Sequence, residues 1–336
     1  MNEYNVKQIQ PAHADHISMY DWTNKKGYNA INNMFENEIV VTQRKYDGER
    51  ILMHFDGDNF YMTSRRKSKK NNNHFTEVQS NFPQFRKNIG IGYTVIDGEL
   101  FADIKNSEGK LVNDWSTIVG IIHSLPERAI QLQKDDNIHV KYAAFDCLFY
   151  DGEDLRDKDY FTRLKYLGKV LALISNEKIF KVKSVNTFTK ERLYKLRDEH
   201  INNGEEGIVV KSLNRKYYDK GAYIKAKRFE TKDVVVYGFD YGNGKYANTV
   251  GALKCGYYDA KTDSIVHITD VNCGTDKDRD EWLQGFKDGS RMNGVIEVKC
   301  QQITKNSLRH PVYMRYRKDK DYKMCTKNTI FEDNNQ

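Results

Sequence analysis

The strongest constraint on the fold is a set of β-rich runs around the hexapeptide KYDGER, residues 45–50. Branched and aromatic side chains dominate Ile39–Thr42, Ile51–Phe55 and Asn59–Thr63, and an Asp-Gly pair between the last two runs predicts a tight turn. Strand connections are places where a rigid sheet can present a reactive side chain. We therefore expect Lys45 to lie in a short connection on a β-sheet scaffold.

Strand and helix patterns alternate in the rest of the N-terminal region. Apolar residues recur with helical spacing between residues 160 and 174, and a second helix is expected over residues 190–202, ending before Gly204. Residues 1–38 have no clear period and predict an irregular or partly helical segment. The further strands that we expect lie at Tyr93–Ile96, Val140–Tyr150 and Ile208–Lys211.

The sequence changes character after residue 230. Short β-rich runs separated by glycine turns begin at residue 233, and one helical pattern interrupts them between residues 276 and 287. Such a series is typical of a small antiparallel barrel. We therefore predict an α+β fold with two domains, residues 1–230 and 231–336, each long enough to bury its own core.

The composition favours a basic intracellular protein. Hydrophobic residues form 39% of the chain and charged residues 30%, as in globular rather than disordered proteins. The formal charge of +7 favours a polyanionic partner such as nucleic acid. Because no apolar run approaches the roughly 18 residues of a membrane span and the N-terminus is polar, we expect a cytoplasmic protein with no membrane partner. The five cysteines are scattered singly, which disfavours a disulfide framework or a zinc site and predicts buried thiols.

Short motifs rich in acids and lysines follow Lys45 along the chain. Each motif alone is weak evidence, because chance matches to short patterns are frequent. Their combination predicts that Lys45 is a covalent nucleophile for a nucleotide, whereas a solvated turn lysine is the commoner alternative. The motifs are Asp97-Gly98-Glu99, Phe145-Asp146, Glu206–Lys211, Lys225-Ala226-Lys227 and Arg317–Lys320.

The charged residues of these motifs have a use in phosphate chemistry. A lysine attacks phosphorus only as the neutral amine, and its ordinary pKa is about 10.4. Lys225, Lys227 and Arg65, if they fold near Lys45, would lower that pKa and neutralise phosphate oxygens. The carboxylates of Glu99 and Glu206 can hold Mg²⁺, which bridges phosphate oxygens, although a surface carboxylate or a structural ion pair is the alternative.

From Gln43 to Lys320 the chain resembles the covalent nucleotidyltransferases, and within them the ATP-dependent DNA ligases in the compact two-domain form of viruses and phages. The hexapeptide at residues 45–50 is similar to the nucleotidyl-lysine motif of that family, and residues 308–320 are similar to its terminal motif. This resemblance implies a nucleotidyltransferase (ATP-grasp-like) adenylation domain with antiparallel sheets and helices, followed by an OB-fold barrel. It also implies ATP and Mg²⁺ as cofactors, a lysyl-AMP intermediate, and a monomer that seals nicked duplex DNA.

The resemblance assigns roles to individual residues. Gln43 stands where the family has an acidic or polar residue beside the amino group of adenine, and Phe145 where an aromatic ring stacks on the base, although core packing would also explain Phe145. Glu99 and Glu206 are the implied metal ligands. The implied catalytic residues are Lys45, Asp47, Lys225 and Lys227. The residues implied to bind the nucleotide are Gln43, Arg44, Lys45, Arg50, Arg65, Glu99, Phe145, Glu206, Lys211, Lys225, Lys227, Arg317 and Lys320.

Other functions stay open at this point. RNA ligases share the lysine chemistry, and RNA capping enzymes combine it with a barrel and GTP. A basic OB-fold protein could bind nucleic acid without catalysis, but binding alone needs no set of acids and lysines. The basic run from Arg65 to Lys70 is a candidate DNA contact, with a solvated loop as the alternative.

Overall fold

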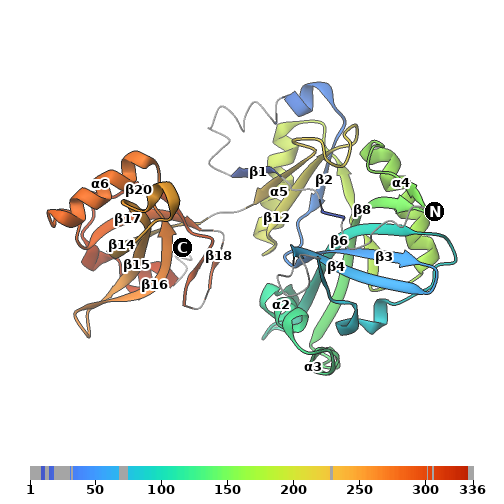
Figure 1. The fold of residues 1–336 in the computed structure, drawn as a ribbon, viewed down its shortest axis with the longest axis horizontal. Coiled ribbons are helices and arrows are strands. Elements are labelled where there is room, and N and C mark those ends of the chain that lie inside the picture. The colour runs from blue at the N-terminus through green and yellow to red at the C-terminus, as the bar shows by residue number, and fades with distance from the viewer. Residues whose placement is uncertain are drawn as a thin grey trace. The chain divides into compact units, whose positions relative to one another are not determined.

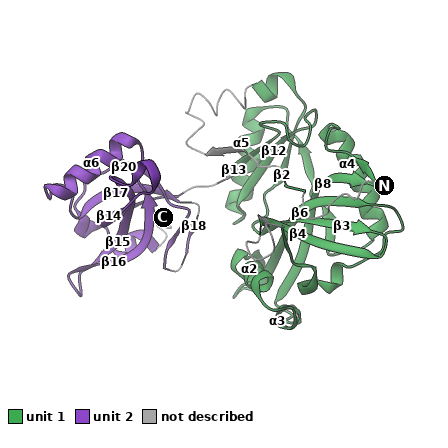
Figure 2. Ribbon diagram, in the orientation of Figure 1, with its two compact units in different colours: residues 1–227 green, residues 228–336 purple. Residues whose placement is uncertain are grey.

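The chain divides into two units, residues 1–227 and 228–336, each with its own hydrophobic core (Figures 1 and 2). None of the helices in the described part of the chain is long and apolar enough to cross a membrane. The computed structural model describes residues 9–11, 15–18, 31, 33–67, 75–227, 230–300, 302–304 and 306–331.

Two β-sheets frame the first unit. The five-stranded sheet contains β1 (Asp15–Ser18), β2 (Val40–Arg44), β11 (Ser184–Asn186), β12 (Gly207–Ser212) and β13 (Tyr223–Lys227). The eight-stranded sheet contains β3 (Glu49–Asp56), β4 (Asn59–Lys67), β5 (Phe75–Glu77), β6 (Thr94–Lys105), β7 (Leu111–Asn113), β8 (Ile138–Tyr150), β9 (Glu153–Asp154) and β10 (Ile179–Lys181). The smaller sheet has the order β1-β13-β12-β2-β11. The larger follows the path β10-β8-β6-β3-β4-β5, with β7 paired to β6 and β9 paired to β8.

The alternation of side chains on β3 shows how these sheets are covered. Met53 and Phe55 join the main core, together with residues of three helices, whereas Leu52 joins a second core with Tyr223 of the smaller sheet. Successive side chains of a strand point to opposite faces. One face of the larger sheet therefore meets the smaller sheet, and its other face is covered by helices.

Helices α2 (Trp115–His123), α3 (Pro126–Leu132) and α4 (Tyr160–Ile174) supply the outer layer, and α5 (Lys190–Asn202) packs on the smaller sheet (Figure 1). The bounds of α4 and α5 match the sequence prediction. In each, an N-cap side chain, Asp159 or Thr189, accepts a hydrogen bond from a backbone N–H of the first turn. Two 3-10 turns, η2 (Gln79–Asn81) and η3 (Pro83–Phe85), precede β6.

The second unit is built on one antiparallel sheet with the strand order β16-β15-β14-β17-β20. Its strands are β14 (Glu230–Tyr241), β15 (Val250–Asp259), β16 (Ser264–Asn272), β17 (Gly294–Cys300) and β20 (Val312–Tyr316), beside the hairpin of β18 (Gln302–Ile303) and β19 (Leu308–Arg309). The sheet is accompanied by α6 (Asp276–Lys287), α7 (Lys327–Phe331), η4 (Gly244–Tyr246) and η5 (Tyr322–Met324). Trp282 of α6 is completely buried in this core. Among the described residues no pairing joins β16 to β20, so closure into a barrel stays a prediction.

Several local predictions are confirmed. The three runs around the hexapeptide form β2, β3 and β4, Gly57 of the turn has a φ of 58°, and α6 has the expected bounds. All five cysteines are buried thiols. The prediction for residues 1–38 is tested only in part: residues 33–37 are helical, but β1 is a strand that was not expected. Residues 68–70 of the basic run lie outside the described residues.

Candidate active site

Lys45 lies in the connection that carries the chain from one sheet of the first unit to the other, between β2 and β3. Its backbone N–H donates to the carbonyl of Gly207 at 2.9 Å. A Cβ at Gly48 would lie 2.2 Å from the carbonyl oxygen of Leu100, so the close approach of the connection to β6 requires glycine. The position of the lysine in a strand connection is therefore confirmed, and the connection is anchored to both sheets.

Asn113, the last residue of β7, clamps the backbone of this connection. Its Oδ1 accepts from the N–H of Asp47 at 2.9 Å, and its Nδ2 donates to the carbonyls of Asp47 at 3.0 Å and Ala102 at 3.1 Å. Sequence reasoning did not identify Asn113, because it lies 66 residues from Asp47 and belongs to no recognisable motif.

The ammonium of Lys45 forms an ion pair with Glu206, which directly precedes β12. Their side chains are only 16% and 10% exposed. Burial lowers the pKa of Lys45, but the charges of Glu206 and then Glu99 outweigh it, so the pKa is raised above its ordinary value. The expectation that neighbouring cations would lower this pKa is wrong in the protein alone, because carboxylates are its dominant charged neighbours.

Glu99 on β6 and Lys225 on β13 bring charge to the same cluster from the two sheets. Burial raises the pKa of Glu99 to about 7, against the opposing charges of Lys45 and Arg50. Burial and the charge of Lys45 lower the pKa of Lys225 to about 8. The cluster can therefore exchange protons near neutral pH, and the two predicted metal ligands both influence Lys45.

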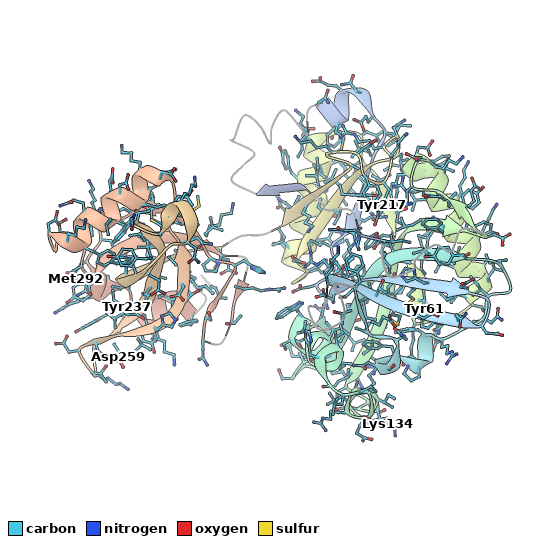
Figure 3. The ribbon with its side chains drawn as sticks, in the orientation of Figure 1. Tyr61, Lys134, Tyr217, Tyr237, Asp259 and Met292 are labelled. Atoms are coloured by element: carbon cyan, nitrogen blue, oxygen red, sulfur yellow. The ribbon has the colours of Figure 1, made fainter. Side chains whose placement is uncertain are left out.

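Arg50 is held beneath the ring of Phe145 by a buried carboxylate. Its Nε donates to Asp97 Oδ1 at 2.9 Å, and its Nη2 donates to the hydroxyl of Tyr217 at 3.1 Å. Asp97 is completely buried and also accepts from the hydroxyl of Tyr217, which is labelled in Figure 3. The guanidinium carbon of Arg50 lies 5.3 Å from the ring centre of half-buried Phe145.

Lys211 and Gln43 share a hydrogen-bond partner that was not predicted, the hydroxyl of Tyr160. Lys211 Nζ donates to it at 3.1 Å and lies 4.3 Å from the ring centre of Phe145. Gln43 Nε2 donates to the same hydroxyl at 3.0 Å and to Ser184 Oγ at 2.9 Å. Burial lowers the pKa of Lys211 to about 7. These contacts place Gln43, Phe145 and Lys211 in one polar network between the sheets.

The two adjacent glutamates of the EEGIVVK motif have different partners. Glu205 forms an ion pair with Arg44 at 3.0 Å and a hydrogen bond with His200 Nδ1, whereas Glu206 pairs with the candidate nucleophile. Arg65 on β4 lies at the edge of the cluster with its side chain 47% exposed, and its Nε is 3.9 Å from Glu49 Oε1.

Among the remaining predicted residues, three are not brought into this cluster by what the structure describes: Arg317, Lys320 and the side chain of Lys227. Arg317 and Lys320 belong to the second unit, where both bind Asp233, at 3.0 Å and 2.8 Å. The side chain of Lys227 lies outside the described residues, although its backbone pairs with Gly207. The charge of Asp47 contributes to the raised pKa of Lys45.

The sequence of the chain is similar to those of known DNA ligases. The model of the ATP dependent DNA ligase domain matches residues 23–228. DNA ligase 2 of Methanosarcina acetivorans is 27% identical over 306 residues, covering 82% of this chain and 51% of the relative, and the DNA ligase of Archaeoglobus fulgidus is 28% identical, covering 85% and 53%. The chain thus spans about half the length of the curated relatives it matches.

A solved structure from work on Lig E DNA ligases shares the fold, with a TM-score of 0.62 at 17% identity. The match covers 92% of this chain and 99% of that one, so it includes both the two-sheet unit and the C-terminal β unit. The residues that the family model matches include every member of the cluster from Gln43 to Lys227. The chain belongs to the family of ATP-dependent DNA ligase domains.

Proposed function

We propose that this protein is an ATP-dependent DNA ligase that joins a 3′-hydroxyl to a 5′-phosphate at nicks in duplex DNA. The observation that carries the proposal is the largely buried Lys45, which lies against Glu206 in a cluster that also contains Glu99 and Lys225. The names of the archaeal relatives support the same activity.

The first step is the attack of the neutral Lys45 amine on the α-phosphorus of ATP. A nitrogen–phosphorus bond forms, the bond from the α-phosphorus to the bridging oxygen breaks, and pyrophosphate leaves. Because the pKa of Lys45 is raised, its ammonium must first lose a proton, and the carboxylate of Glu206 that binds it is placed to accept that proton. Lys225 and Lys227 would neutralise the α-phosphate oxygens during this step.

Two transfers complete the reaction. The 5′-phosphate at the nick attacks the phosphorus of the lysyl-AMP, so that a phosphoanhydride forms and the Lys45 amine is released. The adjacent 3′-hydroxyl then attacks the DNA phosphate, a phosphodiester forms, and AMP leaves. The formal charge of +7 would favour binding of the DNA substrate.

Mg²⁺ fits the carboxylates of this cluster. Glu99 and Glu206 are oxygen donors next to the predicted phosphate position, and both bring negative charge to Lys45. No group of three or more acidic, histidine or cysteine side chains in the described part of the chain is arranged as a complete metal site. Two carboxylates suit Mg²⁺, which keeps several waters and shares phosphate oxygens with its substrate. When bound, it would offset the charge on those oxygens.

The residues between the two sheets would bind the nucleoside. Gln43 would face the amino group of adenine, Phe145 would stack on the base, and Arg50 would contact ribose or phosphate oxygens. Lys211 lies against the same ring and completes this group. Arg44, Arg65, Arg317 and Lys320 stay proposed phosphate contacts; for the last two, the second unit must reach the nucleotide, as in enzymes that close between steps.

The test is covalent labelling by α-labelled ATP, followed by sealing of nicked duplexes in which each strand is in turn DNA or RNA. Lys45→Ala should take up no label and seal nothing. Lys134→Ala is the matched control, because Lys134 is an exposed lysine of the same unit that belongs to none of the motifs (Figure 3). Labelling of Lys45→Ala at the wild-type level would disprove the proposal. If the wild-type protein takes up label but seals no nicked duplex, the proposed DNA substrate would be disproved.

A further inference from the structure

Tyr160 stands at the first position of α4, and its hydroxyl joins three strands of the two sheets. The hydroxyl donates to the carbonyl of Phe145 on β8 at 2.6 Å, and receives Gln43 Nε2 of β2 at 3.0 Å and Lys211 Nζ of β12 at 3.1 Å. Tyr160 is 1% exposed and Gln43 and Lys211 are each 3% exposed, so water cannot easily replace these partners.

The chemistry of these groups fixes the direction of each hydrogen bond. A backbone carbonyl can only accept, so the single proton of the Tyr160 hydroxyl lies on the bond to Phe145. The oxygen of Tyr160 can then only accept from Gln43, which must turn its side-chain NH₂ toward it. The second N–H of that NH₂ is taken by Ser184 Oγ at 2.9 Å. The carbonyl oxygen of the Gln43 side chain is therefore directed away from both partners.

We propose that Tyr160 is a positioning residue that selects adenine over guanine by holding the Gln43 amide with its oxygen toward the base. The inference rests on the proposed function, in which Gln43 faces the nucleotide. Adenine carries a donor amino group at C6, where guanine carries an acceptor carbonyl. A glutamine free to turn could match either base, whereas a glutamine held in this orientation matches adenine alone.

The test compares covalent labelling of the wild type and Tyr160→Phe by three α-labelled nucleotides: ATP, GTP and purine riboside triphosphate, which lacks the amino group. In the wild type, loss of the amino group should lower kcat/KM about tenfold, as expected for one hydrogen bond. In Tyr160→Phe the amide can turn, so the preference for ATP over GTP should fall at least about tenfold, with part of the change a gain in use of GTP. An equal loss with all three nucleotides would leave Tyr160 a purely structural role and overturn the inference.

Ser184→Ala is the matched control. It removes the other acceptor of the Gln43 NH₂ but leaves Tyr160, which alone determines the orientation of the amide. The nucleotide preference should therefore stay within about twofold of the wild-type value, since only a weaker restraint is lost. A loss of preference as large as in Tyr160→Phe would show that Tyr160 has no special role.

A measurement on the wild type does not depend on the folding of any variant. The Gln43 NH₂ signal, assigned as the side-chain amide signal that disappears in Gln43→Glu, should exchange with solvent more slowly than the amide signals of exposed glutamines. Exchange as fast as theirs would overturn the inference. If no nucleotide labels the wild type, the proposed function itself fails; if ATP labels it and Tyr160→Phe keeps the wild-type preference, the inference alone fails.

Discussion

The clamp of Asn113 on the Lys45 connection gives the most direct test of how the fold positions the nucleophile. Asn113→Ala removes three hydrogen bonds, two to Asp47 and one to Ala102. A typical bond contributes about 0.5–1.5 kcal/mol, and water replaces part of this where the groups are half-buried, so we expect a loss of about 2 kcal/mol. If the whole of this free energy is lost from the positioning of the connection, the rate of covalent labelling should fall up to about 30-fold.

Two measurements separate positioning from stability. The single-turnover rate of labelling by α-labelled ATP reports the position of Lys45, and thermal unfolding reports the fold; about 2 kcal/mol corresponds to a fall in Tm of about 4–8 °C for a unit of this size. Asn106→Ala is the matched control, because the Asn106 side chain also binds backbone N–H groups, those of Glu108 and Lys110, but in the turn between β6 and β7. An unchanged labelling rate in Asn113→Ala, or an equal fall in Asn106→Ala, would refute the reasoning.

Three further changes test the packing and charge around the site. Gly48→Ala should destabilise the protein by about 3 kcal/mol in urea unfolding, because the new Cβ would meet the Leu100 carbonyl, and an unchanged midpoint would contradict this. Asp146→Asn should cost about 3–5 kcal/mol, because Arg163 beside it is completely buried, and the double change with Arg163→Met should recover much of that loss. For Lys211, whose pKa is lowered to about 7, the unfolded chain binds more protons between pH 7 and 10. Wild-type stability relative to Lys211→Met should therefore rise through that range by about 1 kcal/mol per pH unit, and a flat or falling difference would exclude the lowered pKa.

Local sequence signals predict those elements whose own residues determine them. The bounds of α4, α5 and α6 were predictable, because each combines helical spacing with a capping side chain. In contrast, α2 has the sequence WSTIVGIIH, whose branched residues favour a strand, and its burial against the larger sheet decides in favour of a helix. Pairing partners of short strands such as β1 and β11 also depend on contacts that no local pattern records.

Local sequence signals likewise predict some residues of the candidate site but not others. Lys45, Glu99 and Glu206 could be selected from sequence, because phosphate chemistry needs these residue types and the motifs supply them. Asn113 and Tyr160 could not, since their partners are far away in the sequence: Asn113 binds the backbone of Asp47, 66 residues away, and Tyr160 binds Gln43, 117 residues away. The direction of the Lys45 pKa shift was also beyond prediction, because it depends on which charges lie nearest after folding.

The ion pairs of the first unit indicate how a nucleotide would enter the site. The family resemblance assigns four cations of this unit to the nucleotide, and each has a carboxylate partner within the protein: Arg44 with Glu205, Lys45 with Glu206, Arg50 with Asp97, and Arg65 with Glu49. Phosphate oxygens must therefore compete with carboxylates for these cations, and binding exchanges one set of anions for another. The pairs differ in burial: Asp97 is completely buried and Arg65 is half exposed, so Arg65 can change partner at much lower cost. Arg50 is thus suited to hold a fixed geometry, whereas Arg65 is suited to respond to the phosphate.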